Sequence, residues 1–206
     1  MKYILYILAI ALAVFTYTVF QSQQSLQSVQ TDANQHSAFA GSDIGGPFKL
    51  VTHTGITVDE NDFSKQFKLI YFGFTYCPSI CPTELQKMAE AYDALPTKIQ
   101  KDLQMLFITV DPERDTVPVM KEYVALFHPN LIGLTGSVEQ VSEAMDNFRV
   151  YAAKAPSETG KSDDYLVDHS SFLYLMSPKN KILDVFKVDT SSEEMREKIE
   201  RIYHSY

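Results

Sequence analysis

Long apolar runs alternate with amphipathic stretches along most of the chain, and the two patterns predict strands and helices in turn. The run "FKLIYFGF" (67–74) is almost continuously apolar, aromatic or β-branched, which is typical of a strand buried on both faces of a sheet. The stretch "TELQKMAEAYDAL" (83–95) repeats apolar residues every three or four positions and ends at Pro96, which predicts a helix. A second apolar run, "LQMLFITV" (103–110), predicts the next strand.

The same two patterns predict the remaining elements of the folded part. They are a hairpin turning at Gly55, a helix over 117–127 capped by Thr116, a strand over 131–136, a helix over 137–148 opened by a Ser-x-x-Gln capping box, a strand over 149–154, a polar loop over 155–164, a hairpin over 171–188 and a terminal helix over 191–206. Strands alternating with helices, then a late hairpin and a last helix, predict an α/β domain. Its sheet is expected to be mixed and covered by helices on both faces.

The start of the chain differs from the rest, because the residues from Tyr3 to Phe20 carry no charge. A run of this length can cross the hydrocarbon core of a bilayer as a helix, so we predict a membrane anchor over 1–20. A cleaved signal peptide is the alternative, with Ala11 and Ala13 as a weak cleavage site, but cleavage there would leave an exposed apolar remnant. The single Lys2 before the run predicts an N-terminus inside the cytoplasm and the remainder of the chain outside it.

A segment rich in Gln and Ser, 21–43, follows the predicted anchor. It contains few large apolar residues, so we predict a flexible tether. The predicted folded domain, 44–206, is of a size that can bury a single core. The chain has a formal net charge of −8, which argues against nucleic acid as a partner, because phosphate binding depends on clustered Lys and Arg.

The only two cysteines, Cys77 and Cys81, lie in "TYCPSICPTEL" between the first buried strand and the helix after it. Pro78 favours an extended Cys77 where that strand ends. Pro82 fits only the first turn of a helix, so both thiols are expected to converge at a helix N-terminus. The partial positive charge there favours the thiolate, the form that binds metals and attacks disulfides.

Three uses fit this cysteine pair. A structural disulfide over so short a loop adds little stability, roughly 2 kcal/mol on the loop-entropy model. A redox couple matches the strand, cysteine pair and helix of thiol-disulfide oxidoreductases, but their usual spacing is two intervening residues and this chain has three. A metal site is the third use, because two thiolates select soft ions such as Cu(I), and an added imidazole gives a Cys₂His site that can also hold Cu(II).

The metal interpretation needs a histidine as third ligand. His36 lies in the predicted tether and His204 near the C-terminus, which leaves His53, His128 and His169. Spacing alone does not choose among these three. His169 is favoured because it ends a polar loop and is expected to open a strand. A structural zinc site is disfavoured, since the chain has neither a second cysteine pair nor a His-x₃₋₅-His motif.

Three motifs in order, "FGFTYCPSICPTEL", "FITVDPERDT" and "YLVDHSSFLYLM", resemble the Sco/SenC family of membrane-anchored copper chaperones. The resemblance runs from "IGGPFKL" to the end of the chain. It implies a thioredoxin-like fold, with Cys77, Cys81 and His169 as the copper ligands. Asp111 falls at the family's Asp-Pro position near the site, although a turn and cap role is an equal alternative. Asp168 could either orient the ring of His169 or shape its loop.

The resemblance also implies a function in the assembly of cytochrome c oxidase. The chain would be a metallochaperone, not a turnover enzyme, that receives copper from an upstream donor and helps to form the binuclear copper centre of oxidase subunit II. In the alternative, Cys77 and Cys81 are a catalytic redox pair of a thiol-disulfide oxidoreductase that reduces the copper-ligand cysteines of that target. Either function would place the domain outside the cytoplasm, on the bacterial inner membrane facing the periplasm or on the mitochondrial inner membrane facing the intermembrane space.

Overall fold

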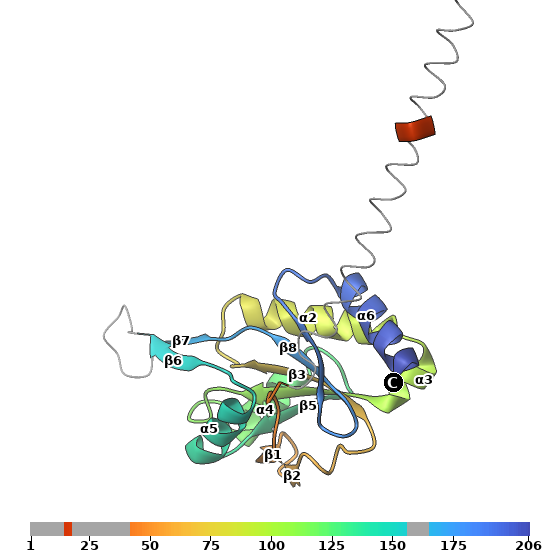
Figure 1. The fold of residues 1–206 in the computed structure, drawn as a ribbon. Coiled ribbons are helices and arrows are strands. Elements are labelled where there is room, and N and C mark those ends of the chain that lie inside the picture. Colours follow the sequence, from red (N-terminus) through yellow and green to blue (C-terminus); the bar gives the residue numbers. More distant parts are fainter. Residues whose placement is uncertain (1–14, 18–41, 156–164) are drawn as a thin grey trace, which may run out of the picture. The chain divides into compact units, whose positions relative to one another are not determined.

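A computed structural model of the chain describes residues 15–17, 42–155 and 165–206. The chain divides into two compact units, Met1–Ala40 and Gly41–Tyr206. In the first unit, residues 15–17 are helical. The second unit forms the α/β domain drawn in Figure 1.

The predicted anchor, apart from residues 15–17, lies outside the described residues, and so does most of the predicted tether. In the part of the chain that is described, no helix has both the length and the apolar character needed to cross a membrane. Nearly all of the predicted polar loop over 155–164 is also outside the described residues.

A mixed sheet of seven strands forms the centre of the domain, in the order β2-β1-β5-β4-β3-β8-β9 (Figure 1). Strands β3, β4 and β5 are parallel to one another, whereas β1, β8 and β9 are antiparallel to their neighbours. Every residue of β3 is buried, as its continuous apolar pattern predicts. The strands are β1 (Lys49–Thr52), β2 (Thr57–Asp59), β3 (Phe67–Gly73), β4 (Leu103–Thr109), β5 (Leu131–Thr135), β8 (Leu173–Met176) and β9 (Ile182–Phe186).

Five helices complete the described part of the domain, and they cover both faces of the sheet as predicted. Figure 1 shows α2 and α6 side by side over one face, where Phe67 of the sheet packs against Tyr203 of α6. The opposite face is covered at the end of α5, where Phe148 packs against Phe72 with ring centroids 5.2 Å apart. The helices are α2 (Ile80–Asp93), α3 (Thr97–Asp102), α4 (Val117–Val124), α5 (Val138–Asn147) and α6 (Ser192–Ser205).

The helix starts agree only in part with the sequence predictions. The capping box at Ser137 is present in full. Thr116 occupies the N-cap of α4, but its side chain makes no capping hydrogen bond, so that prediction was right about the position and wrong about the bond. Helix α2 begins at Ile80, earlier than the apolar periodicity alone indicates, and Cys81 therefore lies in its first turn.

Two strands, β6 (Ala152–Ala155) and β7 (Leu166–His169), form a separate antiparallel ribbon that is not hydrogen-bonded to the main sheet. In Figure 1 the ribbon projects from the side of the domain. His169 closes β7, so the prediction that it opens a strand was wrong, and the next strand begins only at Leu173. Beyond His169, Ser170 still bonds to Tyr151: its backbone N–H donates to the carbonyl oxygen of Tyr151 at 2.9 Å, and its hydroxyl accepts from the backbone N–H of Tyr151 at 3.1 Å.

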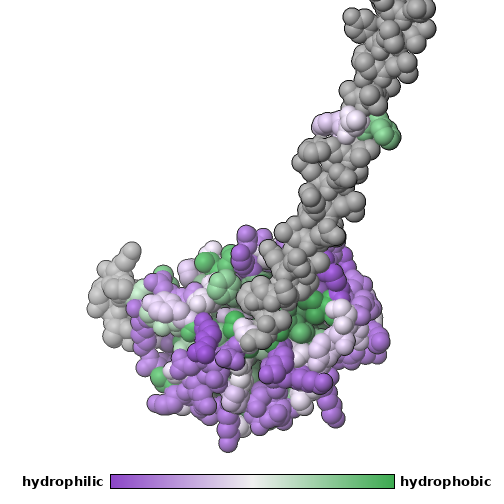
Figure 2. Space-filling view, in the orientation of Figure 1, coloured by the Kyte–Doolittle hydropathy of each residue, from purple (hydrophilic) through white to green (hydrophobic). Residues whose placement is uncertain are grey.

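The surface of the domain is mostly hydrophilic on the face shown in Figure 2, with a smaller apolar region near its centre. Apolar side chains fill the interior, and the largest fully buried ones include Tyr71, Phe72 and Phe107 of β3 and β4. The central pair of parallel strands is therefore the most deeply buried part of the fold. Its C-terminal end is the edge from which the cysteine segment emerges.

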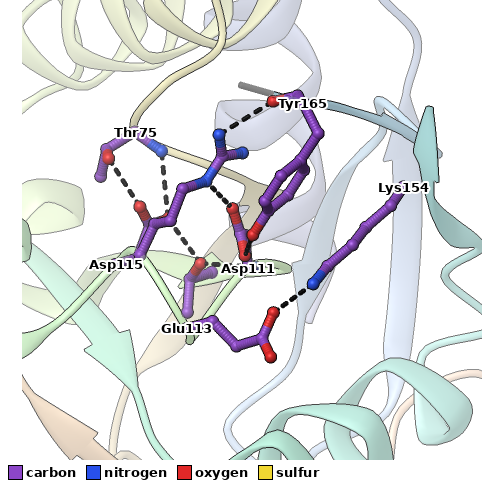
Figure 3. Close-up of polar contacts among 8 residues, drawn as sticks. Thr75, Asp111, Glu113, Asp115, Lys154 and Tyr165 are labelled. Atoms are coloured by element: carbon purple, nitrogen blue, oxygen red, sulfur yellow. Dashed lines mark hydrogen bonds and ion pairs between the residues drawn. The ribbon is translucent and has the colours of Figure 1, made fainter. Parts of the chain in front are cut away.

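The buried carboxylate of Asp115 connects the cysteine segment to the end of β4 through hydrogen bonds. Asp115 has no exposed surface, and it accepts hydrogen bonds from the backbone N–H of Thr75 (3.0 Å), the hydroxyl of Thr75 (2.6 Å) and the hydroxyl of Thr109 (2.6 Å; Figure 3). Burial raises the pKa of Asp115, and these hydrogen bonds oppose that rise. These bonds fix the backbone position of Thr75. Because Thr75 lies two residues before Cys77, they also determine the direction in which the cysteine segment leaves the sheet.

Substitution of Asp115 should therefore destabilise the domain in a way that depends on the replacement. Asp115→Ala leaves one buried and two partly buried donors without this acceptor and should cost about 2 to 4 kcal/mol of unfolding free energy. Asp115→Asn keeps one acceptor oxygen and should cost less. Denaturant unfolding of both variants measures the difference.

The pH dependence provides a second check on Asp115. Because the pKa of Asp115 is raised in the folded state, its contribution to stability is complete below the ordinary carboxyl pKa and is lost as pH rises through the raised value. The stability of the wild type relative to Asp115→Asn should therefore fall with rising pH. A difference that stays constant across the acid range would show that the carboxyl group titrates normally.

Candidate metal centre

The two cysteines meet at the N-terminal end of α2, as the two prolines predict. Cys77 is half-buried, Cys81 is fully buried, and both are free thiols. The sulfur of Cys77 accepts a hydrogen bond from the backbone N–H of Cys81 at 3.4 Å. The N-cap residue Ser79 makes no side-chain capping bond, so the Cys77 sulfur serves as an acceptor for the first turn of α2.

The two thiols have opposite electrostatic environments. The pKa of Cys77 is lowered to about 5, chiefly by a hydrogen bond from the Cys81 thiol and further by the backbone of Cys81, Ser79 and Ile80, whereas burial opposes the shift. The pKa of Cys81 is raised, first by that same bond to Cys77 and then by burial. At neutral pH the pair is therefore a half-exposed thiolate at Cys77 beside a buried thiol at Cys81.

The sulfur of Cys81 lies directly over the end of β3. A Cβ atom added at Gly73 would lie 2.8 Å from this sulfur, so only glycine lets α2 begin so close to the strand. The hydroxyl of Tyr71 donates to the same sulfur at 3.6 Å. Burial, above all, raises the pKa of Tyr71, so the hydroxyl keeps its proton and remains a donor.

His169 brings an imidazole to the buried thiol from the end of β7. Its Nε2 atom lies 3.6 Å from Cys81 Sγ. Its Nδ1 atom lies 3.2 Å from the carbonyl oxygen of Val167, and the ring packs edge-on against Phe74 with centroids 5.5 Å apart. When Nδ1–H donates to that carbonyl, Nε2 carries the lone pair toward the sulfur, which is the tautomer that a metal requires.

The structure thus links Cys77, Cys81 and His169 in a chain of contacts. As the side chains stand, no three Cys, His, Asp or Glu residues of the described ranges are grouped closely enough to hold a metal ion. The donor types fit a soft ion, since two sulfurs and one imidazole nitrogen converge from the cysteine segment and β7. A three-donor site would therefore require the side chains of these residues to move closer together.

The two other histidines that were candidates for the third ligand are engaged elsewhere. His128 pairs with Asp93 at 3.1 Å and also accepts a bond from the backbone of Asn130. His53 accepts from the backbone N–H of Gly133 at 3.1 Å. Neither contacts a cysteine, so among these three histidines the structure brings only His169 to the thiols.

The two aspartates that sequence analysis singled out do not touch the ring of His169 or the sulfurs within the described residues. Asp111 is 3% exposed and accepts from Nε of Arg114 at 2.5 Å and from the hydroxyl of Tyr165 at 2.8 Å. Asp168 is exposed on β7, and Nδ1 of His169 faces the carbonyl of Val167, which leaves the shaping of the loop as the other predicted role of Asp168.

Sequence analysis also missed four polar residues that shape the centre: Tyr71, Arg114, Asp115 and Tyr165. Arg114 and Asp115 stand in the "DPERDT" motif, directly after the buried strand β4. Functional groups gather beyond the C-terminal ends of strands in open α/β sheets, and that position was the one available signal. The bonds of Asp115 to Thr75 and of Arg114 to Tyr165 join residues too far apart along the chain to be recognised from sequence.

Comparison with known proteins places these residues in a family context. The SCO1/SenC family model matches residues 36–204. Protein sco1 of Schizosaccharomyces pombe is 40% identical over 199 residues, which cover 97% of this chain and 76% of the relative. The mitochondrial SCO2 homolog of Mus musculus is 42% identical over 182 residues, covering 88% of this chain and 69% of the relative.

Solved structures show the same fold. Arabidopsis thaliana ScoI, whose crystal structure has copper bound, is 42% identical with a TM-score of 0.73, covering 79% of this chain and 99% of that chain. BsSco, described as a member of the Sco family of cytochrome c oxidase assembly proteins, is 24% identical with a TM-score of 0.58, covering 79% of this chain and 95% of that chain. The mixed sheet flanked by helices is thus the thioredoxin-like fold of the Sco structures.

The asymmetry of the thiols predicts how each reacts with an alkylating reagent. In the reduced, metal-free protein, iodoacetamide should modify Cys77 with a rate that rises through a pKa of about 5. Cys81 should react far more slowly at every pH, because it is buried and its pKa is raised. Tandem mass spectrometry of the peptide that contains both residues measures the two rates.

Cys81→Ala provides the control for this experiment. It removes the largest cause of the lowered pKa of Cys77 but keeps the backbone donors, so the rate profile should move to higher pH. Equal rates at the two cysteines, or faster reaction at Cys81, would contradict the assignment of the thiolate to Cys77.

Proposed function

Because the chain belongs to the SCO1/SenC family, we propose that it is a copper metallochaperone that holds its cargo ion through Cys77, Cys81 and His169. The observation that carries the proposal is the 3.6 Å contact between Cys81 Sγ and His169 Nε2. This contact joins residues 88 positions apart. A ring whose Nδ1 faces a carbonyl oxygen, and whose Nε2 faces a sulfur, is oriented as a metal ligand.

The chemistry of the three donors supports copper as the cargo. Two thiolates favour Cu(I), and the imidazole allows Cu(II) to be held as well. Cys77 is already a thiolate near neutral pH, so it needs no proton loss before binding. Cys81 must give up its proton as the ion binds, which makes copper binding dependent on pH.

A coordination number of three allows the proposed site to release its copper ion. A three-coordinate ion can accept an incoming thiolate before one of the original ligands leaves, so copper passes to another protein by ligand exchange. Cys77 is the ligand best suited to bind the copper ion first and to dissociate from it first, because it is half-exposed while Cys81 is buried. The proposed recipient is the binuclear copper centre of cytochrome c oxidase subunit II, and an upstream donor supplies the ion.

The location proposed for this exchange follows from the apolar run over 3–20. As a single-pass anchor, that run would hold the domain on a membrane with its copper site outside the cytoplasm. The mouse relative is named as mitochondrial, which supports the mitochondrial inner membrane facing the intermembrane space. The periplasmic face of a bacterial inner membrane is the other proposed location.

A second candidate function is thiol-disulfide oxidoreduction, and the lowered pKa of Cys77 favours it. The Cys77 thiolate would attack a disulfide of the target and form a mixed disulfide. Cys81 would then lose its proton and attack Cys77, which releases the reduced target and leaves a Cys77–Cys81 disulfide. Both functions use the same two sulfurs, and only the carrier needs His169.

An anaerobic Cu(I) titration of the reduced protein against a competing chelator tests the carrier function. We expect one tightly bound copper per chain. His169→Ala should weaken the affinity at least about tenfold, because it removes one of three ligands. The fold should survive, since His169 lies at the end of a peripheral strand.

His128→Ala is the matched control, because it removes a histidine that pairs with Asp93 outside the centre, and it should leave the affinity unchanged. If His169→Ala binds copper as tightly as the wild type, His169 is not a ligand. If the folded, reduced wild type does not retain copper, the carrier function is wrong. Reduction of a target disulfide that survives His169→Ala and is lost in Cys77→Ser would then establish the second candidate.

A further inference from the structure

The ribbon of β6 and β7 carries His169 but is not paired with the main sheet. Other contacts must therefore set the position of His169 relative to the cysteines. Within the described ranges, hydrogen bonds join Tyr165, the residue directly before β7, to the loop between β4 and α4. They centre on Arg114.

Arg114 makes two directed hydrogen bonds and stacks on the ring of Tyr165 (Figure 3). Its Nε donates to a carboxylate oxygen of Asp111 at 2.5 Å, and its Nη1 donates to the carbonyl oxygen of Tyr165 at 2.8 Å. The guanidinium carbon lies 3.6 Å from the centroid of the Tyr165 ring. The Tyr165 hydroxyl donates to the other oxygen of Asp111 at 2.8 Å, so Asp111, Arg114 and Tyr165 form a closed cycle, here called the Arg114 clamp.

The clamp also faces the cysteine segment. The guanidinium carbon of Arg114 lies 5.0 Å from the ring centroid of Tyr76, which precedes Cys77, and 5.8 Å from that of Phe74. Phe74 in turn packs edge-on against the ring of His169. One side chain therefore contacts the start of the ribbon, the residue before the first cysteine and the ring that supports the histidine.

Burial makes these contacts stronger than ordinary surface pairs. The Asp111 side chain is 2% exposed and the Arg114 side chain 20%. Lys154 and Glu113 also join the ribbon to the same loop (Figure 3), but their side chains are 55% and 54% exposed, and such pairs contribute little. A planar guanidinium can donate in two directions and stack at the same time, which a lysine cannot do.

We propose that Arg114 is a positioning residue for the third copper ligand, holding β7 so that His169 Nε2 stays beside Cys81 Sγ. The inference rests on the proposed copper site and adds a group that binds no copper itself. His169 lies four residue steps along the chain from Tyr165, about 13 Å when extended. Because a paired ribbon is stiff, fixing Tyr165 limits where His169 can lie and raises the effective concentration of the imidazole at the thiols.

A double-mutant cycle in the full chain tests this proposal. Arg114→Gln should weaken Cu(I) affinity by about tenfold while the imidazole is present, a loss equivalent to about 1.4 kcal/mol. In the His169→Ala background the same substitution should change the affinity by less than about twofold. Arg196→Gln is the matched control, because Arg196 has a similar side-chain exposure of 21% and pairs only with carboxylates of α6.

A metal-free measurement separates this proposal from the copper function itself. The imidazole ¹⁵N and ¹H signals of His169, identified by their loss in His169→Ala, should shift or broaden in Arg114→Gln and stay unchanged in Arg196→Gln. Tyr165→Phe removes only the hydroxyl bond to Asp111 and should have an intermediate effect, which keeps the test available if Arg114→Gln does not fold.

Two results would overturn the role of Arg114. One is an equal loss of copper affinity in both backgrounds, which would mean that Arg114 acts on the cysteines or on the whole fold. The other is a set of His169 signals that no clamp variant changes. Failure of the wild type to bind copper would instead overturn the proposed function, and the metal-free spectra would still decide whether the clamp positions the ring.

Discussion

The position of the Cys81 sulfur over the end of β3 is the constraint that determines how the other groups of the centre are arranged. Gly73 leaves room for the sulfur, Tyr71 donates to it, and helix α2 can therefore begin directly at the edge of the most buried strand. Cys77 is then held beside the first turn of the helix, where the Cys81 thiol and, to a smaller extent, backbone N–H groups lower its pKa. His169 completes the arrangement from a ribbon that has no strand pairing with the main sheet.

The same asymmetry of the two thiols suits a copper carrier and a reductase. An accessible thiolate beside a buried thiol can begin ligand exchange with a metal or with a disulfide. The imidazole is the feature that separates the two chemistries, because thiol exchange does not need it and a three-coordinate copper site does. In the proposed carrier, the contacts of Arg114 matter because they hold the imidazole that distinguishes a carrier from a reductase.

Sequence predicted the parts of the structure whose signals are local. The buried strand over 67–73, the helix that follows it and the meeting of the thiols at its start came from apolar patterns and two prolines. Strand β7 was missed because it is four residues long and only Val167 in it is buried. The short helix α3 was missed for a similar reason, since Ile99 is its one buried residue. The bonds of Asp115 to Thr75 and of Arg114 to Tyr165 span 40 and 51 residues, and no local pattern marks such pairs.

The central claim is that two sulfurs and one imidazole of this chain hold copper together. X-ray absorption at the copper edge of the Cu(I)-loaded protein, with His169→Ala alongside, tests it most directly. The account predicts two sulfur scatterers and one imidazole nitrogen in the wild type, and loss of the nitrogen alone in the variant. A wild-type site with sulfur ligands only, or a nitrogen signal that persists without His169, would contradict it.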